Sequence, residues 1–150
     1  EKLTGRRYGY YEEYRMDDAE IAVVTLNSSA GTAKEVVDMM RDKGFAAGLF
    51  KLRAFRPFPE KEIIEALKGL KAVAVMDRAH SYGSPGGPVF TEIKSAFYEE
   101  PDKPIITNYI YGLGGRNLSV EEVQSVYHEL VEISDTGKVT RPINYLGVRE

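Results

Sequence analysis

Cysteine is absent from the chain. The polypeptide therefore ligates no iron–sulfur cluster, forms no disulfide and offers no thiol nucleophile. Histidine is scarce, since His80 and His128 are the two present, and this limits metal ligation and acid–base chemistry. No apolar run approaches the roughly 18 residues of a membrane-spanning helix. A basic excess is also missing, because 20 Lys and Arg stand against 23 Asp and Glu. A nucleic-acid partner is therefore not expected.

The composition that remains is typical of a soluble globular domain. The chain has 150 residues, of which 43% are hydrophobic and 29% are charged. This length and balance predict one domain with an ordinary hydrophobic core. The first residue is Glu1, without an initiating Met and without a signal-like apolar region. We therefore expect a piece of a longer, cytoplasmic polypeptide.

Residues 1–20 are polar and rich in tyrosine, with Tyr8, Tyr10, Tyr11 and Tyr14 among arginines and glutamates. No apolar period is sustained there, so we predict a linker or arm, followed by a domain that spans residues 21–150. Clustered Tyr and Arg suit a contact surface. A loop packed on its own domain is an equally open interpretation.

From residue 21 onward, apolar runs alternate with helical stripes. Continuous apolar runs are typical of strands covered on both faces, as in parallel sheets. Buried strands are predicted at residues 21–26, 46–50, 72–76 and 104–111. Helices are predicted around residues 33–44, 59–69, 89–97 and 119–130, and an edge strand around residues 142–145. Pro59 is predicted at a first helical position, and Ser119 with Glu122 is predicted to form a capping box. The fold class is thus α/β, with a mostly parallel sheet in a three-layer αβα arrangement.

Ligands collect at the carboxyl ends of the strands in open α/β sheets. The first such loop, residues 27–32, is built of small residues and precedes a helix. Free backbone N–H groups at a helix start favour an anion, but the loop has no phosphate-binding lysine. We expect Ser29 or Thr32 to act as an N-cap here.

The loop after the second predicted strand reads Arg-Ala-Phe-Arg-Pro-Phe-Pro over residues 53–59. Its prolines restrict the backbone and make the segment stiff. Arg53 and Arg56 are able to bind a carboxylate or a phosphate. We expect contact with a protein partner ahead of contact with a ligand.

The loop after the third predicted strand, residues 77–88, carries the most chemical groups. It begins with Asp77 and Arg78 and continues to His80, which is able to donate to an anion or to shuttle a proton. Asp, His and Ser occur together, but the sequence lacks a nucleophile elbow of the GxSxG type, so a catalytic triad is not expected. Three glycines follow, Gly83, Gly86 and Gly87. An anion site or a subunit contact is the preferred interpretation.

The loop after the fourth predicted strand contains Gly112, Gly114 and Gly115 and ends in Arg116. Three glycines indicate positive φ angles or the close approach of another group. Leu113, between them, is a candidate for insertion into a partner.

Six motifs, taken in order, resemble one known family. They are Thr-Gly-Arg-Arg-Tyr-Gly (residues 4–9), Glu-Tyr-Arg (13–15), Asp-Asp-Ala-Glu (17–20), the stretch at 53–59, Ala-Val-Met-Asp-Arg (74–78) and Tyr-Gly-Leu-Gly-Gly-Arg (111–116). Together they are similar to the C-terminal part of the alpha subunit of pyruvate:ferredoxin oxidoreductase (pyruvate synthase). The Arg-Pro-Phe-Pro stretch at 56–59 is closer to the pyruvate enzyme than to its 2-oxoglutarate or branched-chain relatives.

The resemblance implies a fold like the C-terminal domain of transketolase. It also implies a parent enzyme that oxidatively decarboxylates a 2-oxoacid on thiamine diphosphate and Mg²⁺. Electrons then pass through iron–sulfur clusters to ferredoxin, and the acyl group passes to coenzyme A. The partners implied are the other domain of the alpha subunit and the beta, gamma and delta subunits.

No Gly-Asp-Gly signature for a metal diphosphate occurs in this chain. The resemblance therefore implies that the domain binds none of these cofactors alone, supplies no catalytic residue and is inactive by itself. We expect an assembly role, with contact to coenzyme A, another anion or a neighbouring subunit. The candidate residues are Arg53, Arg56, Arg78, His80, Gly83, Gly86, Gly87 and Arg116. A free-standing anion- or nucleotide-binding module and a small enzyme that uses His80 are the alternatives.

Overall fold

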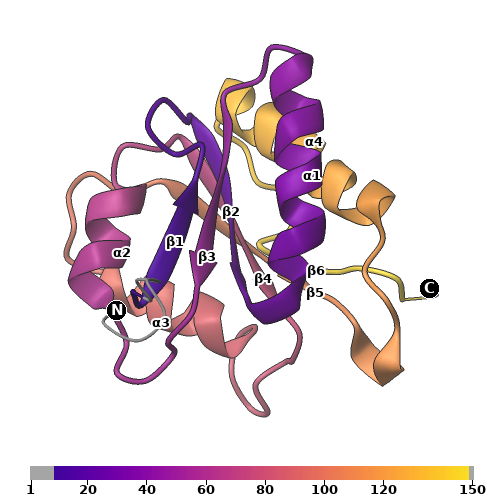
Figure 1. Ribbon diagram of the computed structural model, residues 1–150. Helices are drawn as coiled ribbons and strands as arrows, with labels where there is room; N and C mark the ends of the chain where they lie inside the picture. The colour runs from indigo at the N-terminus through magenta and orange to yellow at the C-terminus, as the bar shows by residue number, and fades with distance from the viewer. Residues whose placement is uncertain (1–8, 149–150) are drawn as a thin grey trace, which may run out of the picture.

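A six-stranded sheet lies between two pairs of helices in the computed structural model, which describes residues 9–148 (Figure 1). The strands are β1 (Tyr11–Tyr14), β2 (Ile21–Leu26), β3 (Ala47–Leu52), β4 (Ala72–Asp77), β5 (Ile105–Ile110) and β6 (Ile143–Tyr145). The helices are α1 (Ala30–Asp42), α2 (Glu60–Leu67), α3 (Pro88–Ala96) and α4 (Val120–Thr136), with short 3₁₀ turns η1 (Asn27–Ser29) and η2 (Leu113–Gly115). The predicted α/β class is confirmed.

The strand order is β1-β3-β2-β4-β5-β6, and every pairing is parallel except that of β1 with β3. Helices α1 and α4 cover one face of the sheet, and α2 and α3 cover the other. Successive strand residues point to opposite faces. On β4, Ala74 and Met76 therefore pack beneath α1 and α4, whereas Val73 and Val75 pack beneath α2 and α3. Burial on both faces explains the continuous apolar runs of the central strands.

Local signals place most of the predicted helix ends correctly. The capping box is confirmed, because Ser119 Oγ accepts from the backbone N–H of Glu122 (3.1 Å), and Glu122 Oε2 accepts from the N–H of Ser119 (2.9 Å). Gly137, whose φ is 67°, follows helix α4 as its C-cap. Pro59 differs from the prediction by one residue. It precedes the helix as the N-cap, and α2 begins at Glu60.

The segment that was expected to hold no strand supplies one. Strand β1 adds to the edge of the sheet, antiparallel to β3, and the Tyr11 ring stacks on Phe50 with 4.8 Å between ring centroids. The hydrophobic pattern of the sequence does not indicate this strand, because the strand is four residues long and has no fully buried side chain. The first resemblance motif lies outside the described residues apart from Gly9. The domain boundary at residue 20 stays a prediction.

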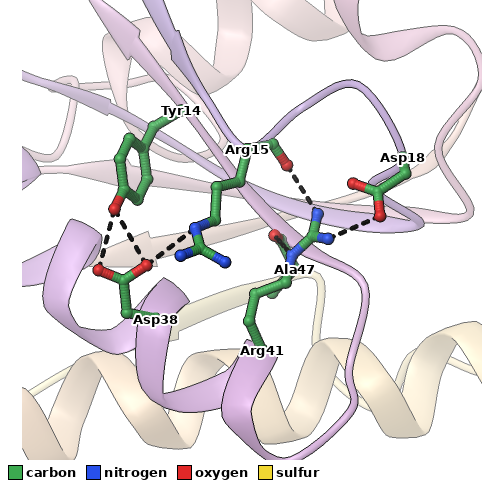
Figure 2. Close-up of polar contacts among 6 residues, drawn as sticks. All are labelled: Tyr14, Arg15, Asp18, Asp38, Arg41 and Ala47. Atoms are coloured by element: carbon green, nitrogen blue, oxygen red, sulfur yellow. Dashed lines mark hydrogen bonds and ion pairs between the residues drawn. The ribbon is translucent and has the colours of Figure 1, made fainter.

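Arg41 on α1 forms hydrogen bonds that hold residues 15–18 of the N-terminal segment against the domain (Figure 2). Its guanidinium group donates to Ala47 O (2.7 Å), to Asp18 Oδ2 (2.8 Å) and to Arg15 O (2.8 Å). Asp38, one helical turn earlier, accepts from the Tyr14 hydroxyl (2.9 and 3.0 Å) and pairs with Arg15. The described part of the segment is therefore packed on the domain.

Gly48 permits the close crossing of residues 15–19 over β3. A Cβ atom at this position would lie 2.7 Å from Met16 Sδ and 2.9 Å from Ala19 Cβ. Any larger residue would push the segment away from the strand. Within residues 9–148, none of the helices has both the length and the apolar character that crossing a membrane requires.

Candidate functional site at the carboxyl ends of the strands

Two hollows lie where β2 and β4 end side by side. The chain leaves β2 toward α1 on one face and leaves β4 toward α3 on the other, which is the arrangement that opens a crevice in a parallel sheet. The first hollow, of about 180 Å³, is lined by Leu26, Ser28, Phe55, Met76, Asp77, Arg78, Ala79, Pro88, Val89 and Tyr111. The second, of about 220 Å³, is lined by Ser28, Ser29, Thr32, Arg78, Tyr111, Arg116, Asn117 and Leu118.

Asp77 is a buried carboxylate at the end of β4, with 3% of its surface exposed. Its oxygens accept from the backbone N–H groups of Val89 (2.9 Å) and Phe90 (3.1 Å), and from Asn108 Nδ2 (3.0 Å). Burial raises the pKa of this carboxyl, and the three hydrogen bonds oppose the increase. The chain's own carboxylate thus occupies the N-terminus of α3, where a bound anion would otherwise lie.

Gly86 and Gly87 pack against this buried pair. Gly87 donates its N–H to Asn108 Oδ1 (2.8 Å), and a Cβ atom on Gly87 would lie 2.2 Å from Asp77 Cγ. Gly86 has a φ of 104°, and its Cβ would lie 2.8 Å from Asn108 Oδ1. Gly83 also has a positive φ, but its Cβ would meet open space. Close packing against Asp77 and Asn108 therefore explains why glycine is needed at positions 86 and 87. Contact of this loop with a ligand or subunit stays a prediction.

Arg78 follows Asp77 directly, and the alternation of the strand sends it to the opposite face. A Cβ atom on Gly112 would lie 3.2 Å from Arg78 Nε and 3.3 Å from the carbonyl oxygen of Arg116, so Arg78 lies along the 112–116 turn. Arg78 and Arg116 are exposed, line the second hollow together and form no ion pair within residues 9–148. The structure brings these two predicted residues together.

Arg53 and Arg56 line neither hollow. Arg53 pairs with Glu12 on β1, and Arg56 pairs with Glu92 on α3 (2.7 Å). The Arg56 guanidinium also lies over the Phe55 ring, 4.1 Å from its centroid. The predicted stiff loop therefore contributes Phe55 to the first hollow, while its arginines bind carboxylates of the same chain.

His80 is held between a loop carbonyl and the last strand. Its Nε2 lies 3.1 Å from Ser84 O, and its Nδ1 lies 2.8 Å from the Tyr145 hydroxyl. Since a carbonyl oxygen only accepts, the neutral ring carries its proton on Nε2, and Nδ1 accepts from Tyr145. Asp77 bonds to α3 and not to this ring. Within residues 77–88, Asp77 and His80 therefore have separate partners and do not bond to each other.

Ser29 occupies the N-cap position of α1, as expected, but its side chain accepts no hydrogen bond from the first turn. Its Oγ lies 2.5 Å from Thr25 Oγ1 and accepts from the Tyr111 hydroxyl (2.9 Å). The resulting chain of hydroxyls connects β2, the start of α1 and the end of β5. Sequence reasoning missed Thr25 and Asn108, although a polar residue inside a buried apolar strand was the available signal.

The arrangement suits the binding of an anion better than bond-making chemistry. Within the described ranges, no cluster of three or more His, Asp or Glu residues is placed to hold a metal ion. The buried carboxylate is already engaged by three donors. Arg78 and Arg116 remain available in an open crevice. Leu113, with 37% of its surface exposed, projects from the same turn.

Comparison with known sequences identifies a consistent set of relatives. The family described as "Pyruvate:ferredoxin oxidoreductase core domain II" matches residues 19–123. The chain is 39% identical over 150 residues to pyruvate synthase subunit PorA of Thermotoga maritima, covering 100% of this chain and 37% of that protein. It is 38% identical over 142 residues to ketoisovalerate oxidoreductase subunit VorA of Pyrococcus abyssi, covering 94% of this chain and 36% of that protein. The chain thus spans less than two fifths of the length of these relatives.

Solved structures share the fold at lower sequence identity. A split-gene transketolase, described as an inactive beta4 tetramer, aligns with a TM-score of 0.65 at 15% identity over 87% of this chain and 44% of that one. The 2-oxoglutarate:ferredoxin oxidoreductase of Magnetococcus marinus aligns with a TM-score of 0.62 at 17% identity over 83% of this chain and 20% of that one. These likenesses confirm the transketolase-like fold.

Proposed function

Because this chain belongs to the family of pyruvate:ferredoxin oxidoreductase core domain II, we propose that it is an assembly domain in the alpha subunit of such an enzyme and supplies no catalytic group. The match to the family over residues 19–123 carries the proposal. The resemblance predicted from six sequence motifs is confirmed at the level of the family. The domain would brace the neighbouring cofactor-binding parts of a complex that acts on a 2-oxoacid in the cytoplasm.

Pyruvate is the substrate that we propose for the complex. The relatives with near-equal identity include both pyruvate synthase and ketoisovalerate oxidoreductase subunits, at 39% and 38%. The preference for pyruvate therefore rests on the Arg-Pro-Phe-Pro stretch at 56–59. Comparison of kcat/KM for pyruvate and for 2-oxoisovalerate in the assembled complex tests it. A higher value for the branched substrate would overturn this part of the proposal.

The residues of this chain do not fit thiamine diphosphate with Mg²⁺, nor an iron–sulfur cluster. Among the residues that the structure describes, Asp77 is the single carboxylate that lines either hollow, and it is bonded to α3 and Asn108. Cysteine is absent from the whole sequence. We propose that these cofactors are held by other parts of the complex. The beta, gamma and delta subunits, ferredoxin and coenzyme A are its proposed partners.

Reconstitution tests the assembly role. We expect the purified chain to show no pyruvate-dependent reduction of ferredoxin in the presence of coenzyme A. The complex assembled with the full alpha subunit should be active. A complex whose alpha subunit lacks residues 9–148 should fail to assemble on a sizing column. Turnover by the chain alone, or full activity without these residues, would contradict the proposal.

Contact with coenzyme A is the finer part of the proposal. Arg78 is its main candidate, because Arg53 and Arg56 are paired with carboxylates of the chain itself. Replacement Arg78→Ala in the assembled complex should raise the Michaelis constant for coenzyme A and leave that for pyruvate unchanged. Normal assembly with an unchanged constant for coenzyme A would remove the ligand role.

A further inference from the structure

Arg78 and Arg116 differ from four other arginines in forming no ion pair within residues 9–148. Arg15, Arg41, Arg53 and Arg56 each form an ion pair with a carboxylate of the chain. Over the described ranges, the structure gives Arg78 and Arg116 none, although both line one crevice. Two neighbouring cations repel each other when nothing lies between them. An oxyanion in the crevice would remove this repulsion.

The lining of the crevice matches an oxyanion. The other wall residues are Ser28, Ser29, Thr32, Tyr111, Asn117 and Leu118, so no carboxylate from residues 9–148 lines the crevice. This composition is notable in a chain with a formal net charge of −3. The side chains of Ser28 and Thr32 make no hydrogen bond within residues 9–148, and their hydroxyls remain available as donors. The crevice thus combines two guanidinium groups with two unoccupied hydroxyl groups.

The walls of the crevice are fixed by internal contacts. Tyr111 donates its hydroxyl hydrogen to Ser29 Oγ (2.9 Å), which holds the end of β5 against the start of α1. Gly112 lets Arg78 lie on the turn that carries Arg116, because any Cβ atom there would lie 3.2 Å from Arg78 Nε. Its φ of 68° also disfavours another residue. Little rearrangement is therefore needed before an anion binds.

We propose that this crevice binds a phosphate group of a phosphorylated small molecule. A phosphate group carries close to two negative charges and three strong acceptor oxygens, which suits two guanidinium groups approaching from separate loops. A carboxylate carries one charge and two oxygens and would satisfy the pair less well. We place the phosphate in this crevice and not at the loop of residues 83–87, because Asp77 already accepts the N–H groups at the N-terminus of α3.

Titration of the 150-residue chain with inorganic pyrophosphate, followed by calorimetry and by amide NMR, tests the proposal. We expect saturable binding, with shifted amide signals at Ser28, Thr32, Arg78 and Arg116. Variants Arg78→Gln and Arg116→Gln should each weaken binding by at least about tenfold, because each removes a charge-assisted hydrogen bond to the anion. Both residues are exposed and form no ion pair, so the thermal unfolding of the variants should match that of the parent chain.

Arg56→Gln is the matched control, because Arg56 is also exposed but lines neither hollow. Its affinity for pyrophosphate should equal that of the parent chain. A second titration uses succinate at the same ionic strength. If succinate bound as tightly as pyrophosphate, the choice of phosphate as the ligand would be overturned. Absence of saturable binding, or equal loss in all three variants, would overturn the site itself. These measurements need no partner subunit, so their failure is distinguishable from failure of the assembly role.

Discussion

The side-chain amide of Asn108 on β5 links the end of β4 to the loop that precedes α3. Its Nδ2 donates to Asp77 Oδ2 (3.0 Å) and to Val75 O (2.9 Å), and its Oδ1 accepts from the N–H of Gly87 (2.8 Å). One buried amide on β5 therefore bonds to strand β4 and to the loop at once. Because buried polar groups are costly when left unpaired, this amide fixes the course of the loop.

Replacement of Asp77 by Asn should destabilise the chain. The two carboxylate oxygens accept from Val89, Phe90 and Asn108, and the amide nitrogen of an asparagine would face one of these donors. We expect a loss of about 1–3 kcal/mol in the free energy of unfolding, measured by urea denaturation. Asp102→Asn, at an exposed position with no ion pair within residues 9–148, is the control and should stay within about 0.5 kcal/mol. Equal effects of the two replacements would contradict the role of Asp77.

Replacement of Gly87 by Ala should destabilise the chain, although it adds only one methyl group. The added methyl carbon would lie 2.2 Å from Asp77 Cγ, so either the loop or the strand end must move. We expect a loss of about 1–3 kcal/mol from overpacking, measured by thermal unfolding.

Gly31→Ala provides the comparison for that replacement. This position lies in the first turn of α1, where a Cβ atom would meet nothing within 4 Å. Alanine should stabilise the helix there by about 0.5–1 kcal/mol. If Gly87→Ala were as stable as Gly31→Ala, the close packing of Asp77 against the loop would be wrong.

Replacement of Arg41 by Lys should loosen the N-terminal segment without removing the charge. A single ammonium group cannot reach Ala47 O, Asp18 and Arg15 O in the three directions that the guanidinium group serves. We expect faster amide hydrogen exchange over residues 15–20 and a loss of about 1–2 kcal/mol in global stability. Arg56→Lys, in the loop between β3 and α2, should leave exchange in this segment unchanged. Unchanged exchange in the Arg41 variant would show that the three bonds do not hold the segment.

Glu12 should make stability sensitive to acid. Its hydrogen bond with Lys34 is the main reason that its pKa lies below the ordinary value of 4.5; burial works against this lowering, and Arg53 and Lys51 add to it. A carboxyl with a lowered pKa stabilises the folded state above the unfolded pKa, and this contribution is lost as the pH falls toward the folded value.

Lys34→Met should therefore be destabilising at about pH 7, and the difference from the parent chain should shrink at about pH 3. Urea denaturation at the two pH values measures this. Lys61→Met, at an exposed position, should change the free energy of unfolding by the same small amount at both pH values. A Lys34→Met penalty that did not change with pH would exclude Glu12 as its source.

The fold was predictable because its signals are local and repeated. The apolar runs of the four central strands, the stripes of α1 and α4 and the capping box at Ser119 all point to one architecture. Strand β1 was not predictable in the same way, since an edge strand of four residues with half-exposed tyrosines carries too short a pattern. Its position depends on Arg41 and Gly48, which lie far from it in the sequence.

The candidate site was predictable in position but not in detail. Parallel strands bring their carboxyl ends to one edge, so the loops at 77–88 and 111–116 had to be neighbours. Which side chains share a crevice depends on packing around the strand ends: Asp77 and Arg78 both line the first hollow, but only Arg78 reaches the second. The sequence did not show that Asp77 would occupy the start of α3, because that requires the register of β4 against β5 and the partner Asn108.

Strand β1 also determines where this polypeptide could be shortened. Its four residues pair along β3 from Leu52 to Leu49, which is the outer edge of the parallel strands. A chain trimmed to begin at residue 21 would leave that row of backbone donors and acceptors unpaired beside Leu49, Phe50 and Leu52. Bare edges of this kind recruit further copies, strand to strand. The trimmed product would be prone to precipitate. The short antiparallel strand therefore protects the edge of β3 from pairing with other copies of the chain.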